Sequence, residues 1–187
     1  MTTTKILVFG ASNSKHSINK KFAEYAARQL SQVELNLVDL NDYESPLYSL
    51  DLEKEIGIHD KALKFNSLIE QSEAIVVSLA EYNGLHSTAF KNLWDWLSRI
   101  PRDTPMNIWG AKPMFLLSTS PSRRTMNNVL KVSKELFPHF GAKIVADFYL
   151  PSFHHFFKDG EIIAEEYLQA FNSQKNKFQT HINSLNK

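Results

Sequence analysis

The 187-residue chain contains no cysteine, which excludes disulfide bonds, thiol nucleophiles and cysteine-ligated metal centres. It also has no surplus of charge, because 21 Lys and Arg residues are balanced by 20 Asp and Glu residues. This balance argues against nucleic acid or a membrane surface as partner, since either would require a basic face. No apolar run approaches the length of a membrane span, and none leads the chain. We therefore expect a cytoplasmic protein.

Glycine is scarce, with six residues in all, and two glycine-rich nucleotide motifs are missing. No Gly-x-Gly-x-x-Gly follows the first predicted strand, so the dinucleotide fingerprint is absent. The Walker pattern fails as well, because Lys15 stands where its second glycine should be. Asp39 ends the second predicted strand, where a ribose-binding acid would lie. Without the glycines we interpret it as a cap or turn residue.

Apolar segments with strand and helix periodicity alternate five times along the chain. This alternation is typical of a parallel sheet that is covered by helices on both faces. We predict one α/β domain over residues 1–187, a three-layer sandwich whose five parallel strands have the order 2-1-3-4-5. The predicted strands are residues 5–10, 33–37, 74–79, 113–117 and 142–150.

Polar loops follow the first, third and fourth predicted strands, at residues 12–17, 81–84 and 118–122. In the order 2-1-3-4-5 these strands are neighbours, so the loops converge at the edge of the sheet where ligands bind. The first loop leads into a helix N-terminus, where unpaired amides and the helix dipole attract an anion. Side chains of Ser12, Ser14, Ser17 and Asn19 add donors there. A phosphate would suit this loop, but a serine that only caps the helix gives the same residues.

Other polar candidates favour structural interpretations. His154 and His155 would point to opposite sides of an extended chain, which is a poor arrangement for a metal, so no metal site is predicted. His86 could reach a ligand of the second loop, but we interpret it as a surface residue. Neither Ser12 nor Ser120 lies in a Gly-x-Ser-x-Gly elbow, which argues against a hydrolytic nucleophile.

Two further pairs are interpreted in the same way. Arg123 and Arg124 could meet an anionic ligand, but a solvated pair before a helix is the preferred interpretation. Trp94 and Trp96 lie on a predicted helix at residues 88–97 that is apolar over much of its circumference. We interpret them as core or interface residues, and we expect the helix to be buried against the sheet and against a second surface.

From Ile6 to about Pro151 the chain resembles the NADPH-dependent FMN reductase family of flavodoxin-like proteins, which includes azo-, quinone- and chromate-reducing members. The family's phosphate loop, Gly-Ser-x-Arg-x-x-Ser-x-Asn, is matched at Ser12, Ser17 and Asn19, while Ser14 stands where Arg is common. Its most specific motifs are Pro-Glu-Tyr-Asn-Gly-Ser, Leu-Lys-Asn and Asp-Trp-Leu-Ser, which resemble residues 80–85, 91–92 and 95–98.

The resemblance implies an oxidoreductase that uses NAD(P)H and FMN and passes electrons to a small-molecule acceptor, namely a quinone, an azo dye or free flavin. The cofactor carries this chemistry, so no catalytic side chain is predicted. The resemblance places the FMN phosphate on the first loop and the flavin ring between the second and third loops. The implied cofactor-binding residues are Ser12, Ser14, Ser17, Ile18, Asn19, Ala80, Glu81, Tyr82, Asn83, Gly84, Ser118, Thr119 and Ser120.

Some residues depart from the family pattern. Ala80 replaces a proline, and Ser122, Thr125 and Met126 replace glycines of a Pro-Gly-x-x-Gly-Gly loop. Side chains at the three glycine positions are expected to narrow the nicotinamide side of the site. The alternative function is therefore a flavin-binding or interaction protein with little reductase turnover. The resemblance and the apolar second face of the helix at residues 88–97 also imply a homodimer or a homotetramer.

Overall fold

The computed structural model describes residues 3–123 and 127–185. Five parallel strands form one sheet in the order β2-β1-β3-β6-β7. Numbered along the chain, this is the order 2-1-3-4-5, so the predicted flavodoxin-like α/β sheet is confirmed. The strands are β1 (Thr4–Ala11), β2 (Val33–Val38), β3 (Ala74–Leu79), β6 (Pro113–Thr119) and β7 (Lys143–Leu150).

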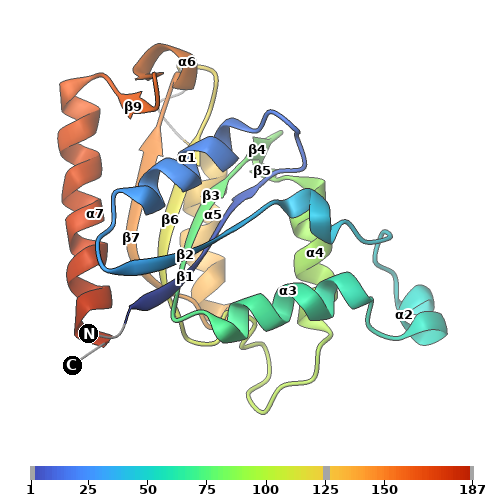
Figure 1. Ribbon diagram of the computed structural model, residues 1–187. Helices are drawn as coiled ribbons and strands as arrows, with labels where there is room; N and C mark the ends of the chain where they lie inside the picture. The colour runs from blue at the N-terminus through green and yellow to red at the C-terminus, as the bar shows by residue number, and fades with distance from the viewer. Residues whose placement is uncertain (1–2, 124–126, 186–187) are drawn as a thin grey trace.

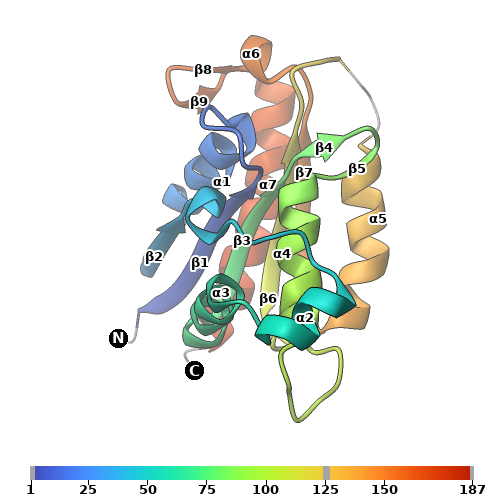
Figure 2. The same ribbon diagram turned by 90° about the vertical axis from the view of Figure 1, so that its right-hand side faces the viewer.

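Helices cover both faces of the sheet and make three layers (Figures 1 and 2). One face carries α1 (Ile18–Arg28) and α7 (Glu165–Leu185), and the other carries α3 (Asp60–Gln71), α4 (Thr88–Ser98) and α5 (Asn128–Leu136). Successive residues of a strand point to opposite layers. In β1, Ile6 and Val8 pack toward α1 and α7, whereas Leu7 and Phe9 pack toward the other layer. Because both faces are buried, the strands consist of continuous apolar runs.

Short elements connect these layers. The polar stretch after β2 contains a 3-10 helix and the small helix α2, none of whose residues is buried. Figure 2 shows α2 standing away from the sheet, beside the ends of α3 and α4. The short elements are η1 (Leu40–Tyr43), α2 (Leu50–Ile56), β4 (Glu81–Tyr82), β5 (Leu85–His86), η2 (Phe137–Phe140), α6 (Phe153–Phe156), β8 (Phe157–Lys158) and β9 (Glu161–Ile162).

The apolar second face of α4 is covered by the chain itself. Trp94 is 4% exposed, and its ring meets that of Phe140 edge-on with centroids 4.9 Å apart. Trp96 is fully buried, and its Nε1 donates a hydrogen bond of 2.8 Å to the carbonyl of Pro46. Both tryptophans are therefore core residues. The second surface that the sequence predicts for α4 lies in η2 and in the segment before α2.

One predicted helix ends earlier than expected. The periodicity from Val129 to Phe140 predicts a single helix, but α5 stops at Leu136 and continues as the 3-10 helix η2. Pro138, which cannot donate a backbone hydrogen bond, lies within η2. Gly141, with φ 83°, caps the C-terminal end of η2 in the left-handed conformation that favours glycine. In the described ranges no helix combines the length and the hydrophobicity that crossing a membrane would require.

Candidate cofactor-binding site

The first loop (residues 12–17) joins β1 to α1 and caps that helix. The Oγ of Ser17 accepts a hydrogen bond of 3.1 Å from the amide of Lys20, which identifies Ser17 as the N-cap residue. The amide of Ser14 donates to the Oγ of Ser12 at 3.2 Å and holds the loop in a turn. The capping interpretation of the sequence is therefore confirmed. It does not exclude an anion, because a cap uses few of the donors of a helix N-terminus.

The first turn of α1 keeps donors for a ligand. Within the part of the chain that is described, no hydrogen-bond acceptor meets the amides of Ile18 and Asn19. These two groups begin the helix, where the helix dipole adds partial positive charge. The exposed hydroxyl of Ser14 lies in the loop in front of them. This set of neutral donors at a helix N-terminus suits a phosphate.

The side chain of Asn19 points into the protein. Its Oδ1 accepts hydrogen bonds from the Oγ of Ser78, at 2.7 Å, and from the amide of Thr119, at 3.1 Å. Its Nδ2 donates to the carbonyl of Thr119 at 3.2 Å. Asn19 lies in the first turn of α1. Its side chain connects this helix to β3 and β6, the strands that carry the other two polar loops. Its side chain thus differs in role from the exposed hydroxyls of the loop.

The second loop is a β-hairpin, not the irregular loop that the sequence predicts. Glu81 and Tyr82 pair with Leu85 and His86 in antiparallel β4 and β5. The two connecting residues, Asn83 and Gly84, have φ values of 54° and 87°. Two successive positive φ values are typical of a type I′ turn, for which Asn-Gly is the favoured pair. The Asn-Gly pair was therefore the signal that could have identified the hairpin.

The hairpin (residues 81–86) is fixed to α5 at two points one helical turn apart. An Oε atom of Glu81 accepts a hydrogen bond of 3.0 Å from the amide of Val129. The Nε2 of His86 lies 2.7 Å from the Oγ of Ser133. Because the Ser133 hydroxyl donates to the carbonyl of Val129, it accepts from the Nε2–H of His86. These contacts hold both strands of the hairpin against one helix.

His86 is not the surface residue that the sequence predicts. Its ring stacks on Phe137, with centroids 5.9 Å apart and planes at 13°, and meets Trp94 edge-on at 5.5 Å. Burial, and secondarily the charge of Lys91, lowers the pKa of His86 to about 4. The prediction is wrong because the hairpin, which the sequence analysis missed, turns this side chain toward α5. His86 is therefore neutral at physiological pH.

The third loop (residues 118–122) is held from both sides. On the β3 side, the Oγ of Ser118 donates to the carbonyl of Leu79 at 2.7 Å and accepts from the Nδ2 of Asn127 at 2.9 Å. On the β7 side, the Oγ1 of Thr119 donates to the carbonyl of Leu150 at 2.7 Å. The backbone segments of Ser118 and Thr119 are therefore fixed relative to β3 and β7.

The outer half of the third loop faces β7 and the segment after it. The hydroxyls of Ser120 and Tyr149 lie 2.7 Å apart, and the carbonyl of Ser122 accepts from the amide of Ser152 at 2.9 Å. Arg123 is exposed, as the interpretation of a solvated residue requires. The remaining departures from the family pattern in this loop, Thr125 and Met126, and the second arginine, Arg124, lie outside the described residues.

Several residues have roles outside these three segments. Asp39 caps η1, because its Oδ1 accepts from the amide of Asn41 at 2.9 Å, and it forms an ion pair of 2.5 Å with Lys20. The prediction of a cap residue is confirmed. His154 and His155 lie in the short helix α6, not in an extended chain. Among the described residues no group of three or more His, Asp or Glu side chains could hold a metal ion.

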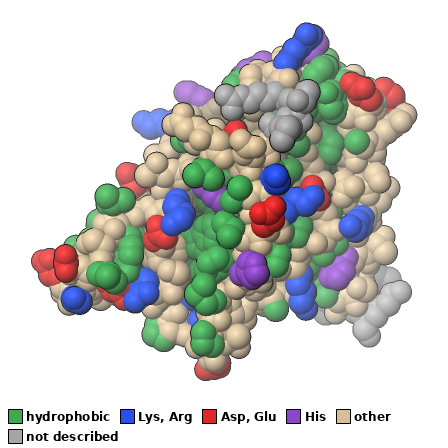
Figure 3. Space-filling view, turned by 180° about the vertical axis from the view of Figure 1, so that it is seen from behind, with side chains coloured by type: hydrophobic (Ala, Val, Ile, Leu, Met, Phe, Trp, Pro, Cys, Tyr) green, Lys and Arg blue, Asp and Glu red, His purple; other side chains and the backbone are tan. Residues whose placement is uncertain are grey.

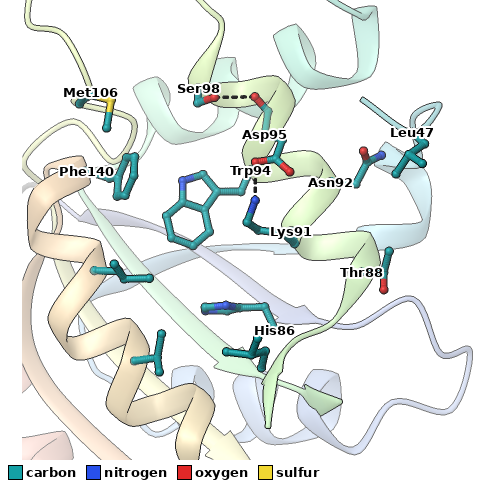
Figure 4. Close-up of a pocket in the computed structure, with 13 residues that line it drawn as sticks. Leu47, His86, Thr88, Lys91, Asn92, Trp94, Asp95, Ser98, Met106 and Phe140 are labelled. Atoms are coloured by element: carbon teal, nitrogen blue, oxygen red, sulfur yellow. Dashed lines mark hydrogen bonds and ion pairs between the residues drawn. The ribbon is translucent and has the colours of Figure 1, made fainter. Parts of the chain in front are cut away.

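A sizeable cavity lies beside the three loops rather than among them. It is a groove of about 590 Å³ between α4, α5 and β5, and His86 forms part of its wall (Figure 4). Leu85, Leu136 and Phe140 make much of its lining apolar. The Lys91–Asp95 ion pair crosses the face of α4 at this groove. The groove therefore adjoins the hairpin but contains none of the predicted phosphate-binding residues.

The family model of the NADPH-dependent FMN reductases matches residues 4–155. The chain belongs to this family. A quinone reductase of Escherichia coli is 30% identical over 103 residues, which are 53% of either chain. The chain thus spans about half the length of the curated relatives it matches.

Two solved structures share the fold at lower sequence identity. The flavoenzyme FerB of Paracoccus denitrificans, an NAD(P)H:(acceptor) oxidoreductase, has a TM-score of 0.75 at 22% identity and covers 97% of this chain and 98% of its own. An azoreductase of Bacillus anthracis has a TM-score of 0.66 at 16% identity, with 95% and 100% covered. The FMN reductase family match and the flavodoxin-like sheet therefore agree.

Proposed function

We propose that this protein is an FMN-containing oxidoreductase that takes electrons from NAD(P)H and passes them to a quinone, an azo compound or free flavin. The observation that carries the proposal is the convergence of the first loop, the hairpin and the third loop at one edge of the sheet, in a chain of the FMN reductase family. Bound FMN supplies the hydride- and electron-transfer chemistry. One domain over residues 1–187 holds this site, and NAD(P)H use implies a cytoplasmic location.

The protein's part is to bind and orient the cofactor. The free amides of Ile18 and Asn19 and the hydroxyls of Ser12, Ser14 and Ser17 provide neutral donors for the phosphate. No lysine or arginine is required, because a helix N-terminus already favours an anion. This donor set supports FMN over a cofactor without phosphate.

The flavin ring is proposed to lie between the hairpin and the third loop. Ala80 and the first four residues of the hairpin, 81–84, form one side of this place, and the backbone turns sharply at the two positive φ angles of Asn83 and Gly84. The third loop contributes Ser118, Thr119 and Ser120. Both segments are anchored to rigid elements, the hairpin to α5 and the third loop to β3 and β7. Rigid support of this kind orients a ligand more accurately than a free loop does.

The test is an absorption spectrum of the purified protein, recorded with and without added FMN and then after anaerobic addition of NADPH or NADH. We expect visible flavin bands that bleach with reductant and return when a benzoquinone is added. Bands that persist with either reductant would favour the alternative, a flavin-binding protein with little turnover. No bound flavin after addition of FMN would overturn the proposal.

We infer further that a second copy of the chain packs against the groove beside α4. Four of its lining residues are large, hydrophobic and exposed, and Figure 3 shows hydrophobic side chains gathered on this face. Apolar patches of this kind mark interaction sites, and the same patch on two copies makes a symmetric dimer. A homotetramer would pair two such dimers. The exposed residues are Leu47, Leu85, Met106 and Leu136.

A further inference from the structure

Asn19 is the polar side chain that connects the elements behind all three segments of the candidate site. It is 4% exposed, and its amide group makes three hydrogen bonds, to Ser78 in β3 and to the amide and carbonyl of Thr119 in β6. Its own backbone lies in the first turn of α1, directly after the first loop. One side chain thus fixes α1 to the ends of two strands.

The sheet lets the first turn of α1 come close at Gly10. Gly10 and Ser78 are partners in the register of β1 and β3. By strand alternation both face the layer that contains α1. A Cβ atom on Gly10 would lie 2.4 Å from the backbone nitrogen of Lys20 and 2.8 Å from the carbonyl carbon of Asn19. Only glycine lets the first turn of α1 approach this closely.

Ser78 provides the hydrogen-bond donor in β3 that the Asn19 side chain needs. It is fully buried in β3, whose other residues are all apolar, and its hydroxyl donates to the Oδ1 of Asn19. A buried hydroxyl without a partner destabilises a protein, so this serine and Asn19 depend on each other.

The bonds of Asn19 argue against direct phosphate binding by its side chain. Both acceptor sites of Oδ1 are occupied by donors, and Nδ2 already gives one hydrogen to Thr119. The donors of Asn19 that remain are its backbone amide, in the first turn of α1, and the second hydrogen of Nδ2, on a side chain held among β3 and β6. We propose that the Asn19 side chain is a positioning residue, which sets the phosphate-binding end of α1 relative to Thr119 at the ring-binding third loop.

This proposal rests on the proposed function, because it assumes that FMN spans the two places. The phosphate and the ring of FMN are joined by a chain of fixed covalent length. Without the bonds of Asn19, Thr119 in the third loop would lose its fixed place relative to α1, so the ring, which FMN and riboflavin share, would be misplaced. Misplacement by about 1 Å can cost roughly a hundredfold in activity.

Riboflavin, which lacks the phosphate, separates a positioning role from phosphate binding. For Asn19→Ala we expect the affinities for FMN and for riboflavin to fall together, by roughly ten- to a hundredfold, so that their ratio stays close to that of the wild type. The matched control is Ser14→Ala, which removes an exposed hydroxyl of the first loop. This control should lower the affinity for FMN but not for riboflavin, so the ratio of FMN affinity to riboflavin affinity should fall.

Two further measurements keep the test decisive if riboflavin binds too weakly or if the variant does not fold. If riboflavin binds too weakly to titrate, the visible circular dichroism of the variant saturated with FMN should differ from that of the wild type, because the ring sits differently. If Asn19→Ala does not fold, Ser78→Ala removes only one bond of the same side chain and should lower both affinities in the same proportion, by less.

An Asn19→Ala variant that loses FMN affinity but keeps riboflavin affinity would overturn the proposal, since Asn19 would then act on the phosphate. Unchanged affinities and an unchanged dichroism spectrum would overturn it too. A wild-type protein that binds no FMN would instead contradict the proposed function, so the two failures are distinguishable.

Discussion

The hydroxyl of Tyr82 lies 3.2 Å from the Oγ of Ser12, so the hairpin and the first loop touch although they are 70 residues apart. The Oγ of Ser12 also accepts a hydrogen bond from the amide of Ser14. The tyrosine therefore engages a hydroxyl that is proposed to serve the FMN phosphate. With Ser12 as the donor of this contact, binding of the phosphate would exchange one hydrogen bond of Ser12 for another.

Replacing Tyr82 by phenylalanine should strengthen FMN binding. The variant keeps the ring but removes the hydroxyl that competes for Ser12, and one hydrogen bond contributes about 0.5–1.5 kcal/mol, which is roughly two- to tenfold in affinity. Fluorescence titration with FMN measures the effect. Riboflavin, used as the control ligand, should bind equally to both proteins. Weaker FMN binding by the variant would contradict this prediction.

Gly10→Ala should destabilise the fold by about 3 kcal/mol, at the upper end of the usual cost of overpacking. The added methyl group would meet backbone atoms of Asn19 and Lys20, which cannot move without displacing α1. Denaturant unfolding gives the free energy. Gly57→Ala is the comparison for backbone strain alone, because nothing lies within 4 Å of its added carbon, and its φ of 73° and ψ of −159° oppose the change by about 1–3 kcal/mol. A Gly10→Ala protein that loses less than about 1 kcal/mol would show that the contact at Gly10 is not tight.

Much of the fold could be predicted from the sequence because parallel strands buried on both faces leave continuous apolar runs. β3 and β6 are examples, being buried along their whole lengths. The positions of the three loops follow from the strand order, since neighbouring parallel strands end at the same edge. These features depend on local patterns and one topological rule.

The remaining features depend on contacts between distant segments. His86 and Ser133 are 47 residues apart, and only the hairpin and α5 together show that the histidine is half-buried against α5. The cover over Trp94 comes from η2, which begins where α5 ends. Asn19 could be a ligand or an internal contact from its position in the motif alone. Its burial depends on Ser78 and Thr119, which the sequence does not connect to it.

The neutral state of His86 should make the stability of the protein pH-dependent. Its folded pKa of about 4 lies below the ordinary value of 6.5, so the unfolded chain binds a proton at higher pH than the folded chain does. The stabilising contribution is therefore complete above about pH 6.5 and is lost as the pH falls toward 4, by about 3 kcal/mol in total.

The measurement is the free energy of unfolding of the wild type and of His86→Gln between pH 7 and 4. The variant should lose stability less steeply over this range, because glutamine takes up no proton. His154→Gln, at an exposed histidine in α6, is the control and should follow the wild type. Parallel curves for wild type and His86→Gln would contradict the prediction.

The groove beside α4 predicts which substitution separates a dimer. Trp94 and Leu97 are unsuitable, since both are buried within their own chain and a charge there would disrupt the core. Leu136 is 39% exposed and lines the groove. Leu136→Glu should raise the dimer dissociation constant at least about tenfold, because burying an unpaired carboxylate is costly.

Light scattering over a concentration series measures the dissociation. The control is Leu63→Glu on α3, where a leucine of similar exposure, 42%, lies outside the groove. It should leave the dimer intact, and both variants should keep the unfolding transition of the wild type because each leucine is partly exposed already. A wild-type protein that is monomeric at high concentration would contradict the inferred dimer. A Leu136→Glu protein that stays dimeric would show that the copies meet through another face, since a glutamate buried in this groove loses its hydration and the lysine there, Lys91, is already paired with Asp95.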